Sequence, residues 1–257
     1  MSRESWFVGA MLLLLCVVAC GPSEKEVAAA AQAEAWTALQ EEHVVLTGLR
    51  GELAASRAEI TAGPEGDEET GLSPEEHAIQ LEKKAAEQEE RINEAADEFS
   101  TTLVAFINEH AGCEGEETND VQAAAVRMKS DEDIELAREY VTKGGDYKRA
   151  LDIVKNAAMV DADNAKLQEV IAELEDLRYM DEDRFSLVEK GMSEADVRAV
   201  IGQVFHGNVR GQGEITYWLY PKVEGAAAGV YYREVRGQLT VYDTDFNAVK
   251  TAVERAQ

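Results

Sequence analysis

The chain has 257 residues and carries 51 Asp and Glu side chains against 25 Lys and Arg, a formal net charge of −26. Nucleic-acid phosphates and anionic lipid surfaces are both bound through clustered cations, so this charge argues against either as an electrostatic partner. At this length we expect one to three domains.

Residues 1–19 have the parts of a secretory signal peptide: Arg3, an apolar run from Trp6 to Ala19, and small residues at its end. The run is about fourteen residues long, too short for a membrane-spanning helix of about 20. Val17-Val18-Ala19-Cys20 resembles the lipobox of bacterial lipoproteins. The resemblance implies that the signal is removed before Cys20 and that Cys20 is acylated; the alternative is ordinary signal cleavage.

Two or three acyl chains on Cys20 would hold the protein on a membrane stably, because each buried CH₂ contributes about 0.8 kcal/mol. Gly21 stands where inner-membrane lipoproteins commonly have aspartate, so the resemblance implies the outer membrane, periplasmic face, with the inner membrane as the alternative. Cys113 is then the one further thiol, and it could be buried, free or paired between chains.

Residues 20–111 are predicted to form the lipid anchor and a helical coiled-coil hairpin with a loop at about 61–72. Two helical stretches have apolar residues at seven-residue spacing, the pattern of a coiled-coil seam: Leu39, Leu46, Leu53 and Ile60 in the first, and Ala85, Ile92, Phe99 and Phe106 in the second. Ser73-Pro74 predicts the start of the second helix. The hairpin could be a spacer or a surface that docks a partner.

An acidic linker is expected over residues 112–129 and a short helical module over 130–180, with Ser130 as a helix N-cap. Within this module the stretch from Gly145 to Asn164 resembles the second helix of a tetratricopeptide repeat, with Ala150 and Val154 at packing positions. Only one copy is present, whereas a solenoid needs three or more. We therefore expect a tetratricopeptide-like (TPR-like) module without a peptide-binding groove.

Residues 181–257 predict two helices followed by a three-stranded antiparallel sheet, which makes the chain α+β. Ser193 is expected to cap a helix that ends at Gly202. The strands are read from ITYWLY, GVYYREV and QLTVYD, with a tight turn at Arg236-Gly237.

Gly191-Met192-Ser193, Val197, Ile201-Gly202, Trp218 and Tyr220 together resemble the SmpA/OmlA (BamE-like) family over about 65 residues. The resemblance implies a small α+β domain in the bacterial envelope and, more distantly, a link to outer-membrane assembly. The chain departs from the family at Val204, where the family usually has proline.

Strand alternation leads to the candidate contact residues. If Ile215, Tyr217 and Leu219 face the helices, Trp218 and Tyr220 point away from them. Tyr242 is expected on the same outward face, and Tyr231 could join it. Such a face either packs under another part of the chain or binds a partner.

The sequence offers no nucleophile beside a base, no paired carboxylates in a recognisable frame and no metal-ligand spacing, so we expect no enzyme, cofactor or metal. The leading expectation is a lipid-anchored envelope protein that acts as a protein-interaction scaffold in outer-membrane assembly or integrity. Cys20 would carry the anchor, and Trp218, Tyr220 and Tyr242 would contact an envelope protein. The alternatives are a periplasmic ligand- or inhibitor-binding module and a purely structural spacer between membrane and cell wall.

Overall fold

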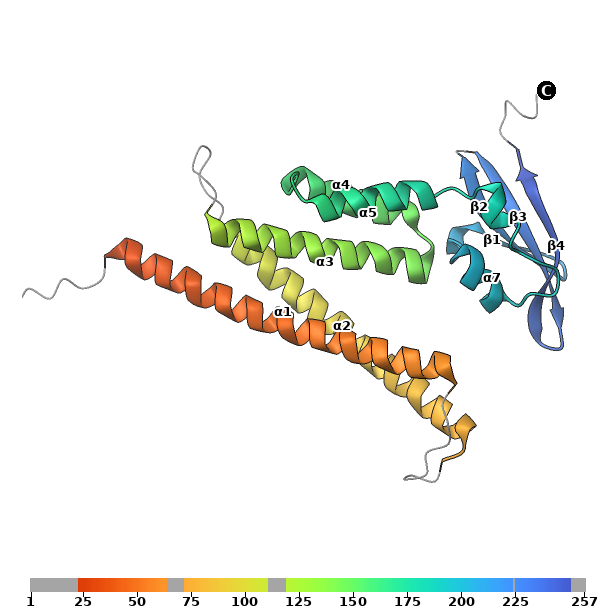
Figure 1. Cartoon of the computed structure of the whole chain (residues 1–257), viewed down its shortest axis with the longest axis horizontal. Coiled ribbons are helices and arrows are strands. Elements are labelled where there is room, and N and C mark those ends of the chain that lie inside the picture. The colour runs from red at the N-terminus through yellow and green to blue at the C-terminus, as the bar shows by residue number, and fades with distance from the viewer. Residues whose placement is uncertain (1–22, 64–71, 111–118, 224, 251–257) are drawn as a thin grey trace, which may run out of the picture. The chain divides into compact units, whose positions relative to one another are not determined.

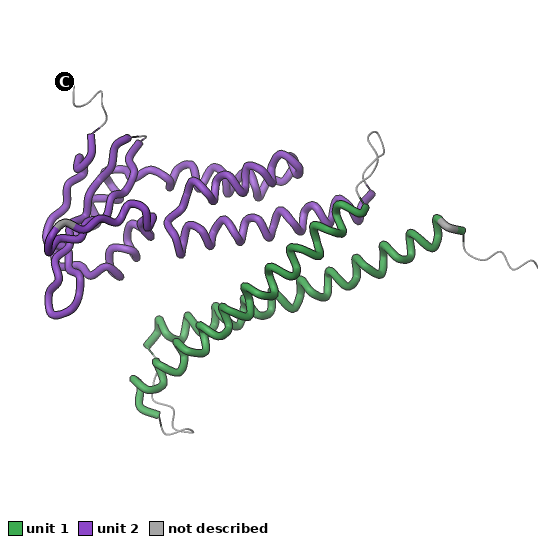
Figure 2. Tube along the Cα trace, turned by 180° about the vertical axis from the view of Figure 1, so that it is seen from behind, with its two compact units in different colours: residues 1–111 green, residues 112–257 purple. Residues whose placement is uncertain are grey.

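The computed structural model describes residues 23–63, 72–110, 119–223 and 225–250. The chain divides into two compact units, Met1–Ala111 and Gly112–Gln257 (Figure 2). Helices come first along the chain and an antiparallel sheet follows near its end (Figure 1). The predicted α+β class is confirmed.

The first unit is a pair of long helices, α1 (Glu24–Ala62) and α2 (Pro74–Glu109). Each begins with a capping box, in which a serine hydroxyl accepts from the third helical N–H and the glutamate there accepts from the serine N–H. Ser73 is the cap of α2 and Pro74 its first residue, as the sequence predicts. Local capping chemistry therefore fixes where both helices start.

The two helices pack along an antiparallel seam. The buried residues include Leu39 and Leu46 of α1, while Leu53 and Ile60 are half-buried. All four predicted seam residues of α2 are buried: Ala85, Ile92, Phe99 and Phe106. Two side chains with poor coiled-coil character, Trp36 and His43, contribute aromatic contacts, with ring centres 5.8 Å from Phe106 and 5.4 Å from Phe99. The end of α2 thus lies beside the first third of α1.

The second unit opens with three helices, α3 (Asp120–Gly144), α4 (Tyr147–Val160) and α5 (Ala165–Leu177). The predicted cap at Ser130 is wrong, because the N-cap of α3 is Asn119, eleven residues earlier, in a capping box with Gln122. Ser130 is instead inside the helix, where its hydroxyl donates to the carbonyl of Val126 at 3.1 Å. Much of the expected linker 112–129 is therefore helix.

These three helices enclose a small apolar core. It contains the two residues that the repeat-like pattern places at packing positions, Ala150 and Val154, both fully buried. Ile134 of α3 and Leu167 of α5 close it from the two neighbouring helices. Ion pairs join the helices at their outer surfaces, such as Arg127 with Asp161 at 2.9 Å.

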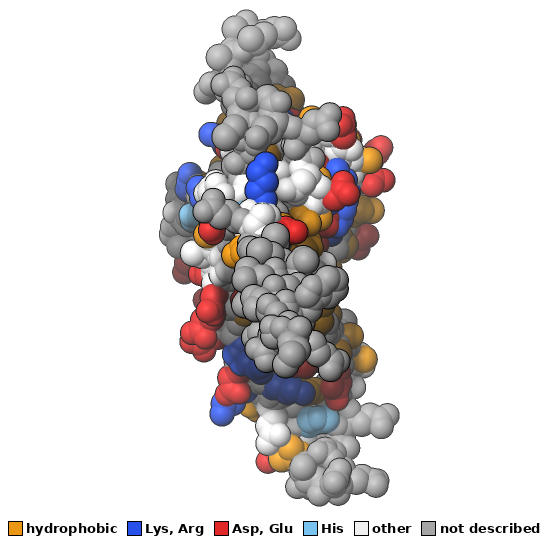
Figure 3. Space-filling view, turned by 90° about the vertical axis from the view of Figure 1, so that its left-hand side faces the viewer, with side chains coloured by type: hydrophobic (Ala, Val, Ile, Leu, Met, Phe, Trp, Pro, Cys, Tyr) orange, Lys and Arg blue, Asp and Glu red, His pale blue; other side chains and the backbone are white. Residues whose placement is uncertain are grey.

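Figure 3 shows acidic and basic side chains interspersed on the part of the surface that faces the viewer.

Gly145 connects this helical core to the module that follows. It ends α3 in the left-handed conformation (φ 62°), and the next N–H donates to the carbonyl of Tyr140. A Cβ on Gly145 would lie 2.4 Å from the carbonyl oxygen of Gln203. The position requires glycine both for its backbone conformation and for this close approach.

Gly145→Ala should therefore lower the free energy of unfolding of the second unit by about 2 kcal/mol, since it adds left-handed strain and a backbone clash. Chemical denaturation of the full chain would measure the change. Gly144→Ala is the matched control, because a Cβ there meets nothing within 4 Å. Equal effects of the two substitutions would contradict this role of Gly145.

The chain ends in a sheet with short helices on one side: α6 (Glu182–Phe185), α7 (Glu194–Ile201) and the 3₁₀ turn η1 (His206–Asn208). Four strands follow in the antiparallel order β1-β2-β3-β4. They are β1 (Val209–Gln212), β2 (Ile215–Val223), β3 (Ala226–Val235) and β4 (Gln238–Val249). The predicted three-stranded sheet lacked β1, which lies in a glycine-rich stretch.

The predicted cap and stop of the helix are both present: Ser193 caps α7 in a capping box with Asp196, and Gly202 (φ 84°) ends it. The segment before α7 also covers part of the β4 edge. Gly191 N–H donates to the carbonyl of Val241 at 2.8 Å, and Val241 N–H donates to that of Met192 at 2.9 Å. These bonds tie α7 to the sheet.

No helix within residues 23–63, 72–110, 119–223 and 225–250 has both the length and the apolar character of a membrane span.

Candidate functional site

Trp218 and Tyr220 lie in the core, so their predicted outward orientation is wrong. Only 2% of the Trp218 surface and 5% of the Tyr220 surface is exposed. They belong to an apolar cluster that includes Val197 and Ile201 of α7. The face of the sheet that carries them is therefore the one that α7 covers (Figure 1). Neither side chain is available to a partner in this structure.

Specific contacts hold the two residues there. The guanidinium carbon of Arg198 on α7 lies 5.0 Å from the ring centre of Trp218. The Tyr220 hydroxyl donates to the carbonyl oxygen of Gly202 at 3.1 Å, which satisfies a helix-end acceptor. Burial raises the pKa of Tyr220 above its usual value. These two aromatic residues anchor α7 to the sheet.

Tyr242 lies on the outward face, as predicted, but the prediction that it shares this face with Trp218 and Tyr220 is wrong. It belongs instead to a row of three tyrosines. The ring centres of Tyr217 and Tyr231 are 5.8 Å apart, and those of Tyr231 and Tyr242 are 6.3 Å apart. All three side chains are half-buried. We define the tyrosine face as these residues with their charged neighbours on the same side of the sheet: Arg210, Tyr217, Tyr231, Arg233, Tyr242 and Asp243.

Strand register accounts for this grouping. Tyr217 pairs with Arg210 of β1 and with Tyr231 of β3, so the three side chains share one face. The register between β3 and β4 shifts after the pair of Tyr231 and Asp243, which leaves Tyr242 as an extra residue. Such a bulge re-aims a side chain and places Tyr242 beside Tyr231.

The charges on the tyrosine face are unevenly compensated. The guanidinium carbon of Arg233 lies 4.2 Å from the ring centre of Tyr242, a cation–π contact. Asp243 pairs with Lys190 at 2.9 Å, and this hydrogen bond holds the pKa of Asp243 below its usual value. Within the described ranges neither Arg210 nor Arg233 forms an ion pair with a carboxylate.

The surroundings of Tyr231 raise its pKa. Partial burial raises its pKa above the usual value, and the nearby carboxylate of Asp245 acts in the same direction. The ring and hydroxyl of Tyr231 lie next to Gly229. A Cβ added to Gly229 would be 3.1 Å from the Tyr231 hydroxyl oxygen. The Tyr231 phenol is thus protonated at neutral pH and can donate a hydrogen bond to a partner.

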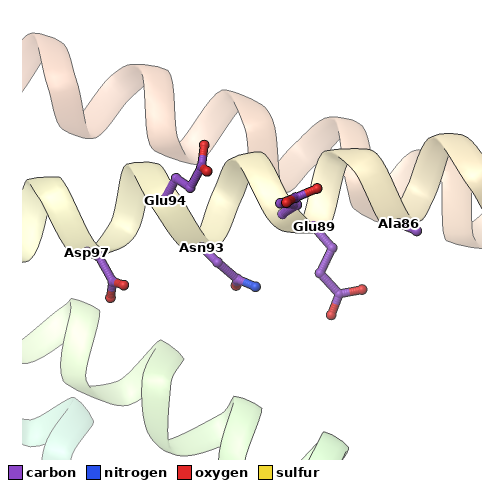
Figure 4. A pocket seen from close by; sticks show the side chains of 6 residues that line it. Ala86, Glu89, Asn93, Glu94 and Asp97 are labelled. Carbon is purple, nitrogen blue, oxygen red and sulfur yellow. The ribbon is translucent and has the colours of Figure 1, made fainter.

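A depression on the first unit does not have the form of a binding site. A surface depression on α2 is lined by six of its residues (Figure 4): Ala86, Glu89, Glu90, Asn93, Glu94 and Asp97. Glu89 is paired with Arg57 at 2.9 Å, and a single helix cannot enclose a ligand. In the part of the chain that the structure covers, no group of three or more His, Cys, Asp or Glu residues could hold a metal ion.

The predicted lipidation residue, Cys20, lies outside the described residues, as do the signal segment 1–19 and Cys113.

No protein-family model matches the chain, and neither the curated proteins nor the solved structures compared with it include a significant match.

Proposed function

We propose that the protein is a non-catalytic, lipid-anchored scaffold of the bacterial envelope, which binds an envelope protein through the tyrosine face and supports outer-membrane assembly or integrity. The lipobox-like stretch that ends at Cys20 supports the anchor and the compartment. The SmpA/OmlA-like pattern around Gly191-Met192-Ser193 supports the link to outer-membrane assembly.

The tyrosine face is the observation that carries the interaction role. Tyrosine and arginine are enriched where protein interfaces are fully desolvated, because each combines a large contact area with a hydrogen-bonding group. Tyr217, Tyr231 and Tyr242 form such a surface on a rigid sheet, opposite the face that α7 covers. A surface of this kind fits a protein partner better than a small ligand, which requires a concave pocket.

The hairpin topology bears on the spacer alternative. At 1.5 Å per residue, α1 is about 58 Å long. A helix of this length could act as a spacer if the rest of the chain continued from its C-terminal end. The antiparallel pairing brings the end of α2 back beside Trp36, only 16 residues after Cys20. The beginning of α1 and the end of α2 therefore lie at the same end of the first unit, which argues against the hairpin as a spacer.

Photo-cross-linking in the native membrane tests the interaction role. A photoreactive amino acid at position 217 should capture a defined partner, whereas the same group at Leu187, which is 52% exposed but lies outside the tyrosine face, should not. Replacing both Tyr217 and Tyr231 by serine should weaken partner binding about tenfold or more. A double variant that stays folded and keeps its partner at full affinity would remove the tyrosine face from the proposal.

A further inference from the structure

We infer that the partner of the tyrosine face is a second copy of this chain, in a two-fold, sheet-to-sheet dimer. The inference rests on the tyrosine face of the proposed function and names its occupant. It follows from the order of side chains across the sheet, from their charges and from the distribution of charge along the chain.

Four outward residues lie in one row that crosses all four strands. Arg210 of β1 pairs with Tyr217 of β2, Tyr217 pairs with Tyr231 of β3, and Tyr231 pairs with Asp243 of β4. The row therefore reads cation, aromatic, aromatic, anion. Neighbouring strands are about 4.8 Å apart, which places the backbone positions of Arg210 and Asp243 about 14 Å from each other.

This order is self-complementary. In a two-fold interface each residue i that contacts residue j of the second copy is matched by j contacting i. A two-fold axis that lies between the two sheets and runs parallel to the strands, midway between Tyr217 and Tyr231, places Tyr217 of one copy opposite Tyr231 of the other. The same rotation brings Arg210 of each copy opposite Asp243 of the other, so two equivalent ion pairs flank a tyrosine centre. Two sheets that pack face to face are about 10 Å apart. An arginine side chain from one sheet can span this distance, and tyrosine side chains from both sheets can fill it.

The state of the charges in the isolated chain fits this arrangement. Arg210 donates to the carbonyls of Gly207 and Val209 of its own strand region and has no ion-paired carboxylate among the described residues. Asp243 already contacts Lys190, but these side chains are 53% and 68% exposed. An ion pair that is this exposed contributes little to stability, so the Asp243 carboxylate can also accept a second cation.

Electrostatic repulsion between two copies is weakest at residues 181–257, which carry the tyrosine face. Residues 181–257 contain nine Lys and Arg against twelve Asp and Glu, whereas residues 24–110 contain six against 21. Two copies of a chain with net charge −26 repel each other through their helical parts. A contact through the nearly balanced C-terminal module meets the least repulsion, and each dimer would carry two acyl anchors.

A charge-reversal cycle tests the dimer. Sedimentation equilibrium of the full chain in detergent would give the dimer dissociation constant of the wild type, Arg210→Asp, Asp243→Arg and the double variant. Each single reversal should weaken dimerisation about tenfold or more, because it places like charges together at both symmetric contacts. The double variant restores both ion pairs with opposite polarity and should recover wild-type affinity. Arg236→Asp, in the β3–β4 turn and outside the row, is the matched control and should leave the constant unchanged.

The result separates the dimer from the broader proposal. A wild type that stays monomeric, while position 217 cross-links to another envelope protein, overturns the second copy as occupant and leaves the interaction role intact. A dimer that is insensitive to both single reversals also overturns the arrangement, because another surface must then hold it. Loss of dimerisation in both single variants with recovery in the double variant supports it, provided that circular dichroism shows all variants folded.

Discussion

Replacement of Trp218 by alanine should destabilise the C-terminal module by about 3–5 kcal/mol, the usual cost of removing a large aromatic side chain from a core. Trp218 is 2% exposed, and its ring centre lies 4.7 Å from that of Tyr232, which is completely buried. The guanidinium of Arg198 would lose its ring contact as well. The smaller side chain would leave a cavity between α7 and the sheet.

Hydrogen exchange of the β3 amides in the full chain is the suitable measurement, since a chain of two units need not unfold in one step. The matched control is Tyr217→Ala, at the preceding residue of the same strand but on the outward face. Because Tyr217 is half-buried, this substitution should cost clearly less than Trp218→Ala. If the tyrosine proves the costlier of the two, the assignment of inward and outward faces is wrong.

Cys20→Ala should abolish acylation and release the protein from the membrane. One acyl chain alone gives only marginal, reversible binding, whereas two or three hold a protein stably. The net charge of −26 supplies no electrostatic attraction to anionic lipid that could compensate. Palmitate labelling should fall to background in this variant, and the protein should appear unprocessed or in the soluble fraction.

Cys113→Ala is the control for thiol chemistry in general, and it should keep full labelling and membrane association. Labelling that survives in Cys20→Ala would show that another residue carries the acyl group. Labelling that is lost while membrane association persists would show that the protein holds to the membrane by another route.

Local sequence signals were sufficient to predict the start of α2 and both ends of α7. Ser73 followed by Pro74 and Glu76 specifies the start of α2, since all the groups that satisfy the first helical N–H donors lie within four residues. Ser193 and Gly202 delimit α7 for the same reason. The turn at Arg236-Gly237 was also predictable, because glycine marks tight hairpin turns and Gly237 has the positive φ (83°) that such turns require.

The start of α3 and the strand β1 were missed because their sequences resemble loops. Asn119 follows a stretch rich in glycine and glutamate, and only its pairing with Gln122 marks it as a cap. β1 holds Gly211 and adjoins Gly213, residues that disfavour strands in isolation. Pairing with β2 stabilises it, and a tertiary contact of this kind is not encoded in the four residues themselves.

The two faces of the sheet could not be assigned from β2 alone. Ile215, Tyr217 and Leu219 are about as apolar as Trp218 and Tyr220, so the alternation lacks the polar residues that mark an outward face. β3 carries a clearer signal: Ala228, Val230 and Tyr232 are buried, whereas the alternate position 233 is arginine. Arg233 pairs with Ile215, which identifies the tyrosine face as outward.

Mass spectrometry of the amino-terminal peptide of the native protein tests the anchored scaffold most directly. We expect a mature chain that begins at Cys20 and carries the added mass of two or three acyl chains. An unmodified amino terminus at any other position would contradict it.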